Sequence, residues 1–458
     1  MLTKDQIKKI LLTAKGNADF SELYFENTKF TSVKFESGRI DEITGGIDRG
    51  VSLRVVKGEK EYLSYTTSVD YDTLYNMAKL FEELFGKAKG DLEFKDLNYE
   101  NPSKVEIPPS SVEFSKKVSL VIRADKAARG YDPLVVQVMA MYSDTQKVIS
   151  IYNSYGEHTH DERTYTSFLV QTVATDGKDV QTGYKVISGT KGFELFKETS
   201  PEEVAKESAR LAITQLKAEP APAGTYQVVL SSSAGGTMIH EACGHGLEAD
   251  LVEKGGSVYR GKIGQKVASE LITVVDDGTL PGKRGTTGID DEGVPSQRVV
   301  LIEKGILKGY LHSRKTAKKF GVMPTGNGRR ESFRYLPIPR MRNTMVLPGK
   351  DDPEDIIKSV KRGILIKKMG GGQVDITSGD FIFNCPEAYL IEDGKQGKAL
   401  RGATLIGNGP KVLESIDMVG NDLGFEVGTC GKDGQGVPVS DAQPTVRIPE
   451  IVVGGIVK

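Results

Sequence analysis

The segment Ala218-Glu219-Pro220-Ala221-Pro222-Ala223-Gly224 decides how this chain of 458 residues is organised. It is rich in proline and lacks an apolar periodicity, which is typical of a linker between domains. A chain of this length exceeds the usual size of one hydrophobic core, so two domains are expected. The segment therefore predicts an N-terminal domain of residues 1–217, a linker of residues 218–224 and a C-terminal domain of residues 225–458.

The residues before the linker predict a mixture of helices and antiparallel strands. The capping-box pattern Thr3-Lys4-Asp5-Gln6 opens a helix that stops at Gly16. Alternating apolar and polar residues over 23–67 predict strands, with turns at Gly45-Gly46 and Lys57-Gly58. The other elements expected in this domain are helices over 74–86, 114–130 and 200–217, and strands over 135–188.

The residues after the linker favour strands. A strand over 226–230 leads through a loop of small residues into a short helix that carries two histidines. A hairpin is expected over 299–307 with Lys304-Gly305 in its turn, and a helix from Asp352-Pro353 to Gly363. We therefore predict an α+β fold, with an N-terminal α+β domain and a β-rich C-terminal domain of mainly antiparallel sheets.

The overall composition narrows the class of function. The chain has 61 basic and 62 acidic residues, and this balance argues against a broad surface for nucleic acid or anionic lipid. It shows no signal-peptide pattern and no apolar run of the roughly 20 residues that span a bilayer, so a cytoplasmic protein without membrane attachment is expected. Its three cysteines include no CxxC pair, which argues against a disulfide framework.

The sequence His240-Glu241-Ala242-Cys243-Gly244-His245 predicts a metal site, because it places two of only five histidines around a glutamate. Zinc-binding helices commonly use histidines four residues apart, on one face. At a spacing of five, an ideal α-helix leaves the two imidazoles about 140° apart. A π-bulge, or a break at Gly244, would bring them back to one side.

The glutamate between the histidines favours catalysis over a purely structural metal. A zinc ion activates water, and Glu241 is placed to take the proton from it. A catalytic zinc site usually has three protein ligands, so two histidines do not complete it. The spacing leaves the third ligand open among Glu248, Asp250, Glu253, Cys243, Cys385, Cys430 and His312.

Three other charged motifs are less specific. The cluster Asp290-Asp291-Glu292 fits either an ordinary exposed turn or a loop that orients a ligand or binds a substrate amine. The arginines of 329–342 favour salt bridges or recognition of a substrate carboxylate over nucleic-acid binding. His158 and His160 are interpreted as solvated residues of a loop.

Four separate segments of the chain resemble the TldD/PmbA (TldE) family of zinc metallopeptidases, and specifically its catalytic subunit. The similarity covers most of the C-terminal domain, whereas the N-terminal domain matches only in general layout. The matching segments are residues 240–248, 290–295, 325–332, and 428–431 with 434–438.

The resemblance implies a zinc ion held by His240, His245 and a C-terminal cysteine, Cys430, with Glu241 as the catalytic glutamate. It also implies a closed chamber that admits unfolded or short peptides. The partner that it implies is a PmbA (TldE)-like subunit without the metal motif, or a second copy of the chain.

A rival hypothesis comes from the older description of this family as modulators of DNA gyrase. It describes a non-catalytic regulatory or binding protein in which zinc only stabilises the fold. The sequence does not identify the natural substrate, the residues that bind it or the route by which peptides enter.

Overall fold

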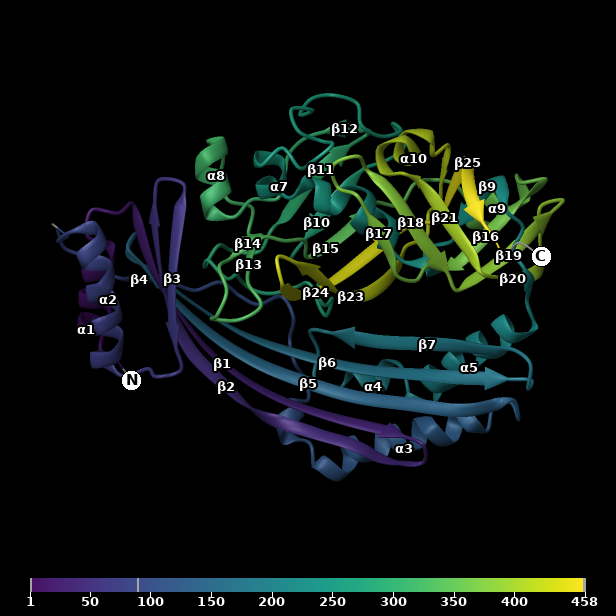
Figure 1. Ribbon diagram of the computed structural model, residues 1–458, viewed down its shortest axis with the longest axis horizontal. Helices are drawn as coiled ribbons and strands as arrows, with labels where there is room; N and C mark the ends of the chain where they lie inside the picture. The colour runs from purple at the N-terminus through teal and green to yellow at the C-terminus, as the bar shows by residue number, and fades with distance from the viewer. Residues whose placement is uncertain (1, 89, 456–458) are drawn as a thin grey trace.

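The computed structural model describes residues 2–88 and 90–455. The N-terminal half is built on a seven-stranded sheet of order β3-β2-β1-β5-β6-β4, with β7 also paired to β6. Its long central strands curve beneath the C-terminal half (Figure 1). The strands are β1 (Phe20–Glu36), β2 (Arg39–Lys57), β3 (Lys60–Thr66), β4 (Lys95–Leu97), β5 (Val135–Asn153), β6 (Glu157–Thr175) and β7 (Val180–Gly189).

Helices cover this sheet on the side away from the C-terminal half and at one end (Figure 1). The capping box predicted at Thr3 is present, a second one is found at Ser200, and each opens a helix at the expected place. The apolar faces of these helices fill two cores against the strands. The helices are α1 (Lys4–Lys15), α2 (Tyr71–Phe85), α3 (Phe114–Arg129), α4 (Leu195–Glu198) and α5 (Pro201–Lys217).

The predicted turn at Gly45-Gly46 is wrong. The chain reverses at Ser37-Gly38, both with positive φ, and the glycine pair lies inside β2 opposite Phe30 and Thr31. A Cβ at Gly46 would approach the Phe30 ring to 3.4 Å, and one at Gly45 would lie 3.3 Å from the Phe30 carbonyl oxygen. These glycines therefore let the backbone pass close to Phe30 within a continuous strand.

Two large sheets form most of the C-terminal half. The six-stranded sheet has the order β12-β11-β10-β15-β24-β23. Its last pair, β23 and β24, is an antiparallel hairpin that carries residues of the site described below. The strands are β10 (Val274–Asp277), β11 (Arg298–Glu303), β12 (Ile306–Leu307), β15 (Asn343–Val346), β23 (Gly424–Lys432) and β24 (Gln435–Gln443).

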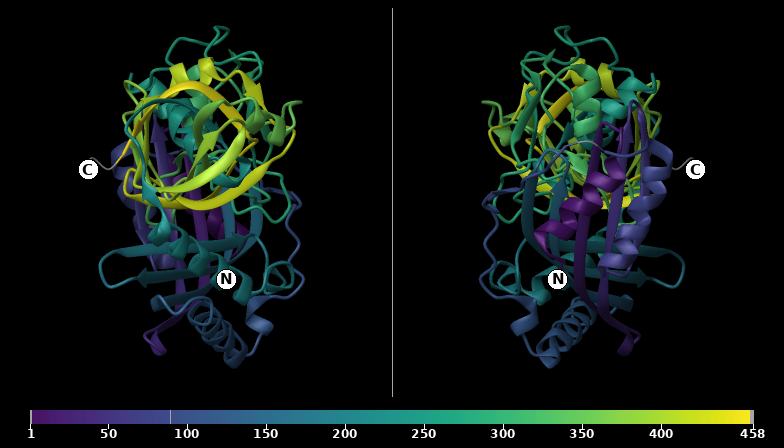
Figure 2. Two further views of the ribbon diagram at one scale, coloured as in Figure 1. Left: turned by 90° about the vertical axis from the view of Figure 1, so that its right-hand side faces the viewer. Right: turned by 90° about the vertical axis from the view of Figure 1, so that its left-hand side faces the viewer.

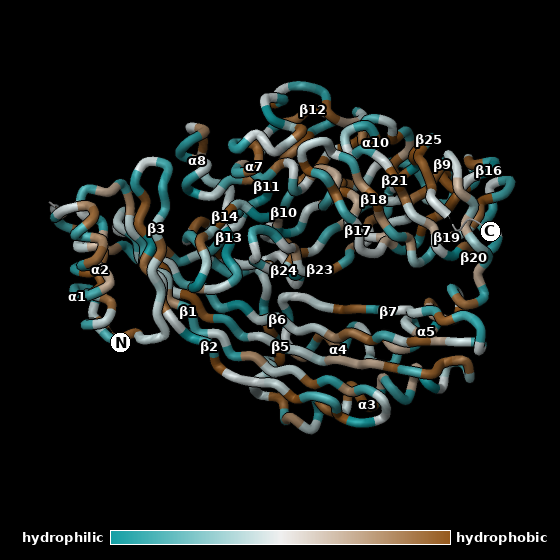
Figure 3. Tube along the Cα trace, viewed as in Figure 1, coloured by the Kyte–Doolittle hydropathy of each residue, from teal (hydrophilic) through white to brown (hydrophobic). Residues whose placement is uncertain are grey.

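The second sheet has ten strands and curls round on itself (Figure 2, left). Its main order is β17-β18-β21-β25-β9-β16-β19-β20-β8, and β22 (Met418–Val419) pairs with β25. Apolar segments recur along β18, β21 and β25 (Figure 3). The strands are β8 (Glu219–Pro220), β9 (Gly224–Leu230), β16 (Arg362–Lys368), β17 (Gly372–Val374), β18 (Asp380–Cys385), β19 (Glu387–Glu392), β20 (Lys395–Arg401), β21 (Ala403–Asn408) and β25 (Val446–Gly454).

Most strand pairs in these sheets are antiparallel, which confirms the predicted α+β class. The expected hairpin turn is present, with positive φ at Lys304 and Gly305. The helix α9 (Pro353–Lys358) is shorter than predicted, because Gly363 already lies in β16. Part of the predicted linker forms β8, which pairs with β20, and the division into two domains stays our proposal.

The acidic cluster 290–292 is buried, so its interpretation as an exposed turn is wrong. Protein groups bind it without a metal or a substrate: arginines pair with Asp291 and Glu292, and backbone N–H groups donate to Asp290. Asp291 pairs with Arg163 at 2.6 Å, and Glu292 pairs with Arg54 at 2.6 Å. Six residues join the N-terminal sheet to the C-terminal half, and we call them the interface network: Asp291, Glu292, Arg54, Arg163, Arg330 and Glu22.

Among the residues described, no helix is long and apolar enough to cross a membrane.

Candidate metal centre

The two histidines lie on a helical segment that changes its pitch. The α-helical turn Thr237–Ile239 passes into a π-helical turn at His240–Gly244 and then into a 3₁₀ turn at His245–Leu247. In the wide turn the backbone N–H of His245 donates to the carbonyl of His240, five residues earlier. Gly244 is required there, because a Cβ would lie 2.1 Å from the sulfur of Met341. This is the wider turn that the histidine spacing predicted.

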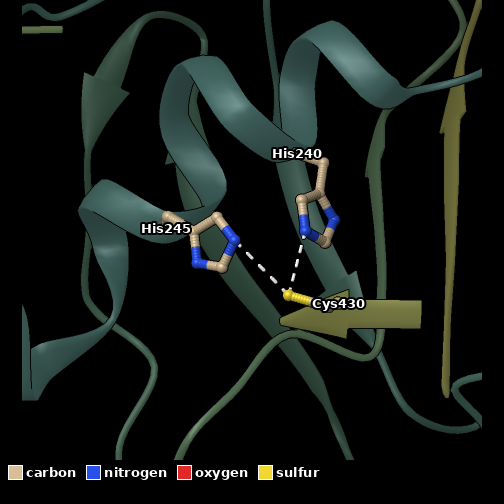
Figure 4. A group of neighbouring side chains, drawn as sticks. All are labelled: His240, His245 and Cys430. Carbon is tan, nitrogen blue, oxygen red and sulfur yellow. Dashed lines mark hydrogen bonds between the residues drawn. The ribbon is translucent and has the colours of Figure 1, made fainter. Parts of the chain in front are cut away.

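The distortion brings the two imidazoles to one side, where Cys430 of β23 meets them (Figure 4). The Nε2 of His240 lies 3.1 Å from the Cys430 sulfur, and the Nε2 of His245 lies 3.4 Å from it. The three donor atoms all lie within 4.8 Å of one another, and all three residues are buried. A tetrahedral zinc ion with ordinary bond lengths separates such donors by roughly 3.5 Å, so the cluster fits one divalent ion.

The Nδ1 atom of each imidazole contacts a carboxylate. His240 Nδ1 lies 2.6 Å from Asp441 Oδ1, and His245 Nδ1 lies 3.0 Å from Glu248 Oε2. A carboxylate at Nδ1 fixes the ring orientation and leaves Nε2 to face an ion, which is the usual arrangement around histidine ligands. The second carboxylate is itself positioned by Lys432, whose Nζ donates to Glu248 at 3.0 Å.

The pKa values of the three donor residues bear on metal binding, because a metal ion must replace the protons that they hold. Burial disfavours the cationic form of His245, but Glu248 and Cys430 outweigh it and raise its pKa to about 9. For His240, burial is likewise outweighed by Asp441, and its pKa is well above the ordinary value. Burial opposes the thiolate of Cys430, yet the two histidines lower its pKa to about 6. Without metal the cluster therefore favours a thiolate beside imidazolium, and a metal ion would displace those protons.

Among the described residues, the other ligand candidates from the sequence do not add a donor atom to the group of His240, His245 and Cys430. Glu248 and Asp250 both bind Lys432, and Glu253 pairs with Lys319. Cys243 donates to the Ile239 carbonyl. Cys385 is buried in the core, and His312 is buried beside Thr316. Asp441 and Lys432 were not anticipated, because neither lies in a pattern that marks it.

A cavity of about 780 Å³ opens onto the cluster. His240, His245 and Cys430 line it, and so does the half-buried Glu241. Its walls also include residues of β23, the segment of β17, and Tyr184 and Val186 of β7. The glutamate between the histidines thus shares one cavity with all three donor residues.

His158 and His160 lie far from this cluster in the fold, and their placement in a loop is wrong. Both belong to β6. His158 stacks on Tyr152 with ring centroids 4.0 Å apart, and its Nδ1 lies 2.7 Å from Asp96 Oδ1. His160 is largely exposed.

Family models match the chain in three consecutive regions. The models are described as the PmbA/TldA metallopeptidase domain 1, over residues 21–85, the central domain, over 107–216, and the C-terminal domain, over 223–455.

Full-length relatives are also found. A protein of Haemophilus influenzae named metalloprotease TldD homolog is 41% identical over 457 residues, which cover 96% of this chain and 93% of that protein. A metalloprotease of Methanothermobacter thermautotrophicus is 34% identical and covers 98% of this chain and 99% of its own.

Solved structures share the fold. One is a protein of Thermotoga maritima described as a candidate modulator of a DNA gyrase, with a TM-score of 0.82 and 24% identity over 98% of this chain and 100% of that one. Another is TldE of Thermococcus kodakarensis, with a TM-score of 0.78 and 20% identity over 98% and 100% of the two chains.

Proposed function

Because the chain belongs to the TldD/PmbA family of metallopeptidases, we propose that it is a zinc peptidase that hydrolyses unfolded or short peptides in a closed chamber. One observation carries the proposal: His240, His245 and Cys430 present three donor atoms to one point, and Glu241 lines the same cavity. A structural zinc would need the donors but not a carboxylate at the cavity wall.

In this proposal some residues hold the zinc ion, and Glu241 transfers a proton. Zinc, when bound, supplies a Lewis acid and lowers the pKa of water towards about 7. Glu241 accepts a proton from the attacking water and returns it to the leaving amine. Asp441 and Glu248 hold the imidazoles in the orientation that leaves Nε2 free.

Two strand edges support an extended peptide as the substrate. β17 ends the ten-stranded sheet and β23 ends the six-stranded sheet. Residues of both strands line the metal cavity. A peptide can pair its main chain with such an edge, which gives affinity without demanding a particular sequence. A folded protein has most of its main-chain groups already paired, so it offers fewer of them to such an edge.

A second subunit is part of this proposal, either a PmbA (TldE)-like chain or a second copy. The shared fold with a solved TldE supports that pairing, and so does an apolar stripe on β2. Ile40, Ile43 and Ile47 are 42%, 53% and 66% exposed there. Exposed apolar residues grouped on one strand are typical of an interaction surface.

The decisive experiment compares Glu241→Gln with the parent protein. Glutamine keeps the size of the side chain but cannot accept the proton, so zinc should remain while peptide cleavage falls at least 100-fold. Zinc content is measured by mass spectrometry of the metal, and cleavage by mass spectrometry of an unstructured peptide. Both proteins are assayed alone and with a co-expressed PmbA (TldE)-like subunit.

Glu253→Gln is the matched control, because it removes a nearby surface carboxylate that pairs with Lys319. It should keep both zinc and cleavage. Equal cleavage by Glu241→Gln and the parent would contradict the proposal. Stoichiometric zinc without cleavage in the parent, with or without the partner, would favour the regulatory protein with a structural zinc.

A further inference from the structure

A second cavity, of about 630 Å³, also borders the β23–β24 hairpin, where Thr429, Val437 and Pro438 line it. Thr429 lines both cavities, and it directly precedes Cys430 in the chain. The β23–β24 hairpin is therefore common to the metal cavity and to this one. The opposite wall comes from the N-terminal sheet, including Lys147, Arg163 and Tyr165.

Cations dominate the wall of this second cavity, and most of them are neutralised. Lys147 pairs with Glu26 at 3.2 Å and Arg163 with Asp291 at 2.6 Å. Arg334 makes two hydrogen bonds to Asp48, at 2.6 and 2.9 Å. These three cations need no further anion.

Arg284 and Arg329 differ, because neither forms an ion pair with a carboxylate anywhere in residues 2–88 and 90–455. Arg329 is 4% exposed and donates only to backbone carbonyls, those of Met341 at 2.5 Å and Pro438 at 2.7 Å. Arg284 donates from Nη2 to the Thr429 hydroxyl at 3.3 Å. Its buried Nε has no hydrogen-bond partner among the described residues.

Burial without a counter-ion destabilises both guanidinium groups. It lowers the pKa of Arg284, and burial together with the nearby Arg342 lowers the pKa of Arg329 to about 10. A carboxylate of the wall, Glu331, accepts the backbone N–H of Gly436, and it does not pair with either arginine. The cavity thus keeps an excess of positive charge that an anion would stabilise.

We propose that this cavity binds a carboxylate of the peptide substrate, with Arg284 and Arg329 as its donors. The planar guanidinium fork matches the two oxygens of a carboxylate, and charge-assisted pairs of this kind are the strong ones. The shared Thr429 places the bound group next to the metal cavity along one hairpin. The inference rests on the proposed peptidase function for its ligand class, and it makes the enzyme selective for peptides with a carboxylate on one side of the cleaved bond.

Binding to the Glu241→Gln protein tests the proposal without hydrolysis. The probes are one fluorescent unstructured peptide with a free C-terminus, the same peptide as a C-terminal amide, and the amide with a terminal glutamate. The free acid should bind about 10- to 100-fold more tightly than the amide, as expected for charged hydrogen bonds. If the amide that ends in glutamate binds as tightly as the free acid, the site accepts side-chain carboxylates as well as the C-terminal carboxylate.

Adding Arg284→Gln should abolish the preference for the free acid, whereas Arg284→Lys should restore part of it, which a folding defect would not do. Arg334→Gln is the matched control and should keep the preference, because Asp48 already neutralises Arg334. Equal affinity for acid and amide, or a preference that survives Arg284→Gln, would overturn the proposal. A clear preference for the free acid, together with no peptide cleavage by the parent protein with or without a partner subunit, would uphold this site and reject the peptidase function.

Discussion

The metal cluster and the interface network are both buried and polar, but they satisfy their charges in opposite ways. In the network, permanent arginine cations meet carboxylates, as in the pair of Arg54 with Glu292 at 2.6 Å. In the metal cluster, His240, His245 and Cys430 are themselves groups that can lose protons. The first arrangement is complete with protein atoms alone, whereas the second gains by taking up a cation.

This difference teaches how to separate a structural charge cluster from a functional one. Acidic residues gathered in the sequence at 290–292 were also compatible with a site, although less specifically than the histidines. Their partners show otherwise, because each carboxylate is bound by arginine or by backbone N–H groups. The histidines instead direct both Nε2 atoms towards the sulfur of Cys430 at the wall of a cavity.

The largest expected effect comes from Cys430→Ser. Loss of the thiolate leaves two histidines, so we expect zinc to fall from about one equivalent to near zero and cleavage to fall about 1000-fold or more. Cys385→Ser is the control, because Cys385 is equally buried but lies in the core. The measurement is metal content after dialysis, with peptide cleavage beside it. If Cys430→Ser kept its zinc, Cys430 would not be a ligand. The contrast between the metal cluster and the interface network would then fail.

A smaller effect is expected from Arg54→Met in the network. Arg54 is 1% exposed and faces Glu22, Glu61 and Glu292. Its removal leaves the buried Glu292 without an ion pair among the described residues, whereas Arg330 and Lys315 still pair with the other two carboxylates. We expect the free energy of unfolding to fall by about 3–5 kcal/mol, measured by urea denaturation. The folded fraction should retain its zinc, since the two clusters share no residue.

Arg334→Met is the control for the stability lost in Arg54→Met. The ion pair of Arg334 with Asp48 is partly exposed, so it should contribute about 1 kcal/mol or less to the free energy of unfolding. A combined change, Arg54→Met with Glu292→Gln, should recover part of the stability. If zinc were lost from folded Arg54→Met, the two clusters would be coupled, and the distinction drawn between them would fail.

The sequence predicted local features well and distant ones poorly. The capping boxes and the wide helical turn depend on residues within about five positions of one another, and each is present. The resemblance alone singled out Cys430, since spacing left seven candidates. Asp441 and Lys432 were missed, because they reach the site only through the β23–β24 hairpin. The interface network was missed for the same reason, since Arg54 and Glu292 are 238 residues apart.

The smaller effect expected at the metal cluster is that of Asp441→Asn, which tests the support of the ligands instead of the ligands themselves. Asparagine can still accept a hydrogen bond from His240 Nδ1 but loses the charge that favours a cation nearby. We expect zinc affinity to fall about 10- to 100-fold, with the fold intact, as measured by competition with a chelator. Asp417→Asn, which removes a surface carboxylate paired with Arg447, should leave the affinity unchanged. An unchanged affinity in Asp441→Asn would mean that the histidines are oriented by the helix alone, because the π-helical turn would then suffice to aim both Nε2 atoms at the ion.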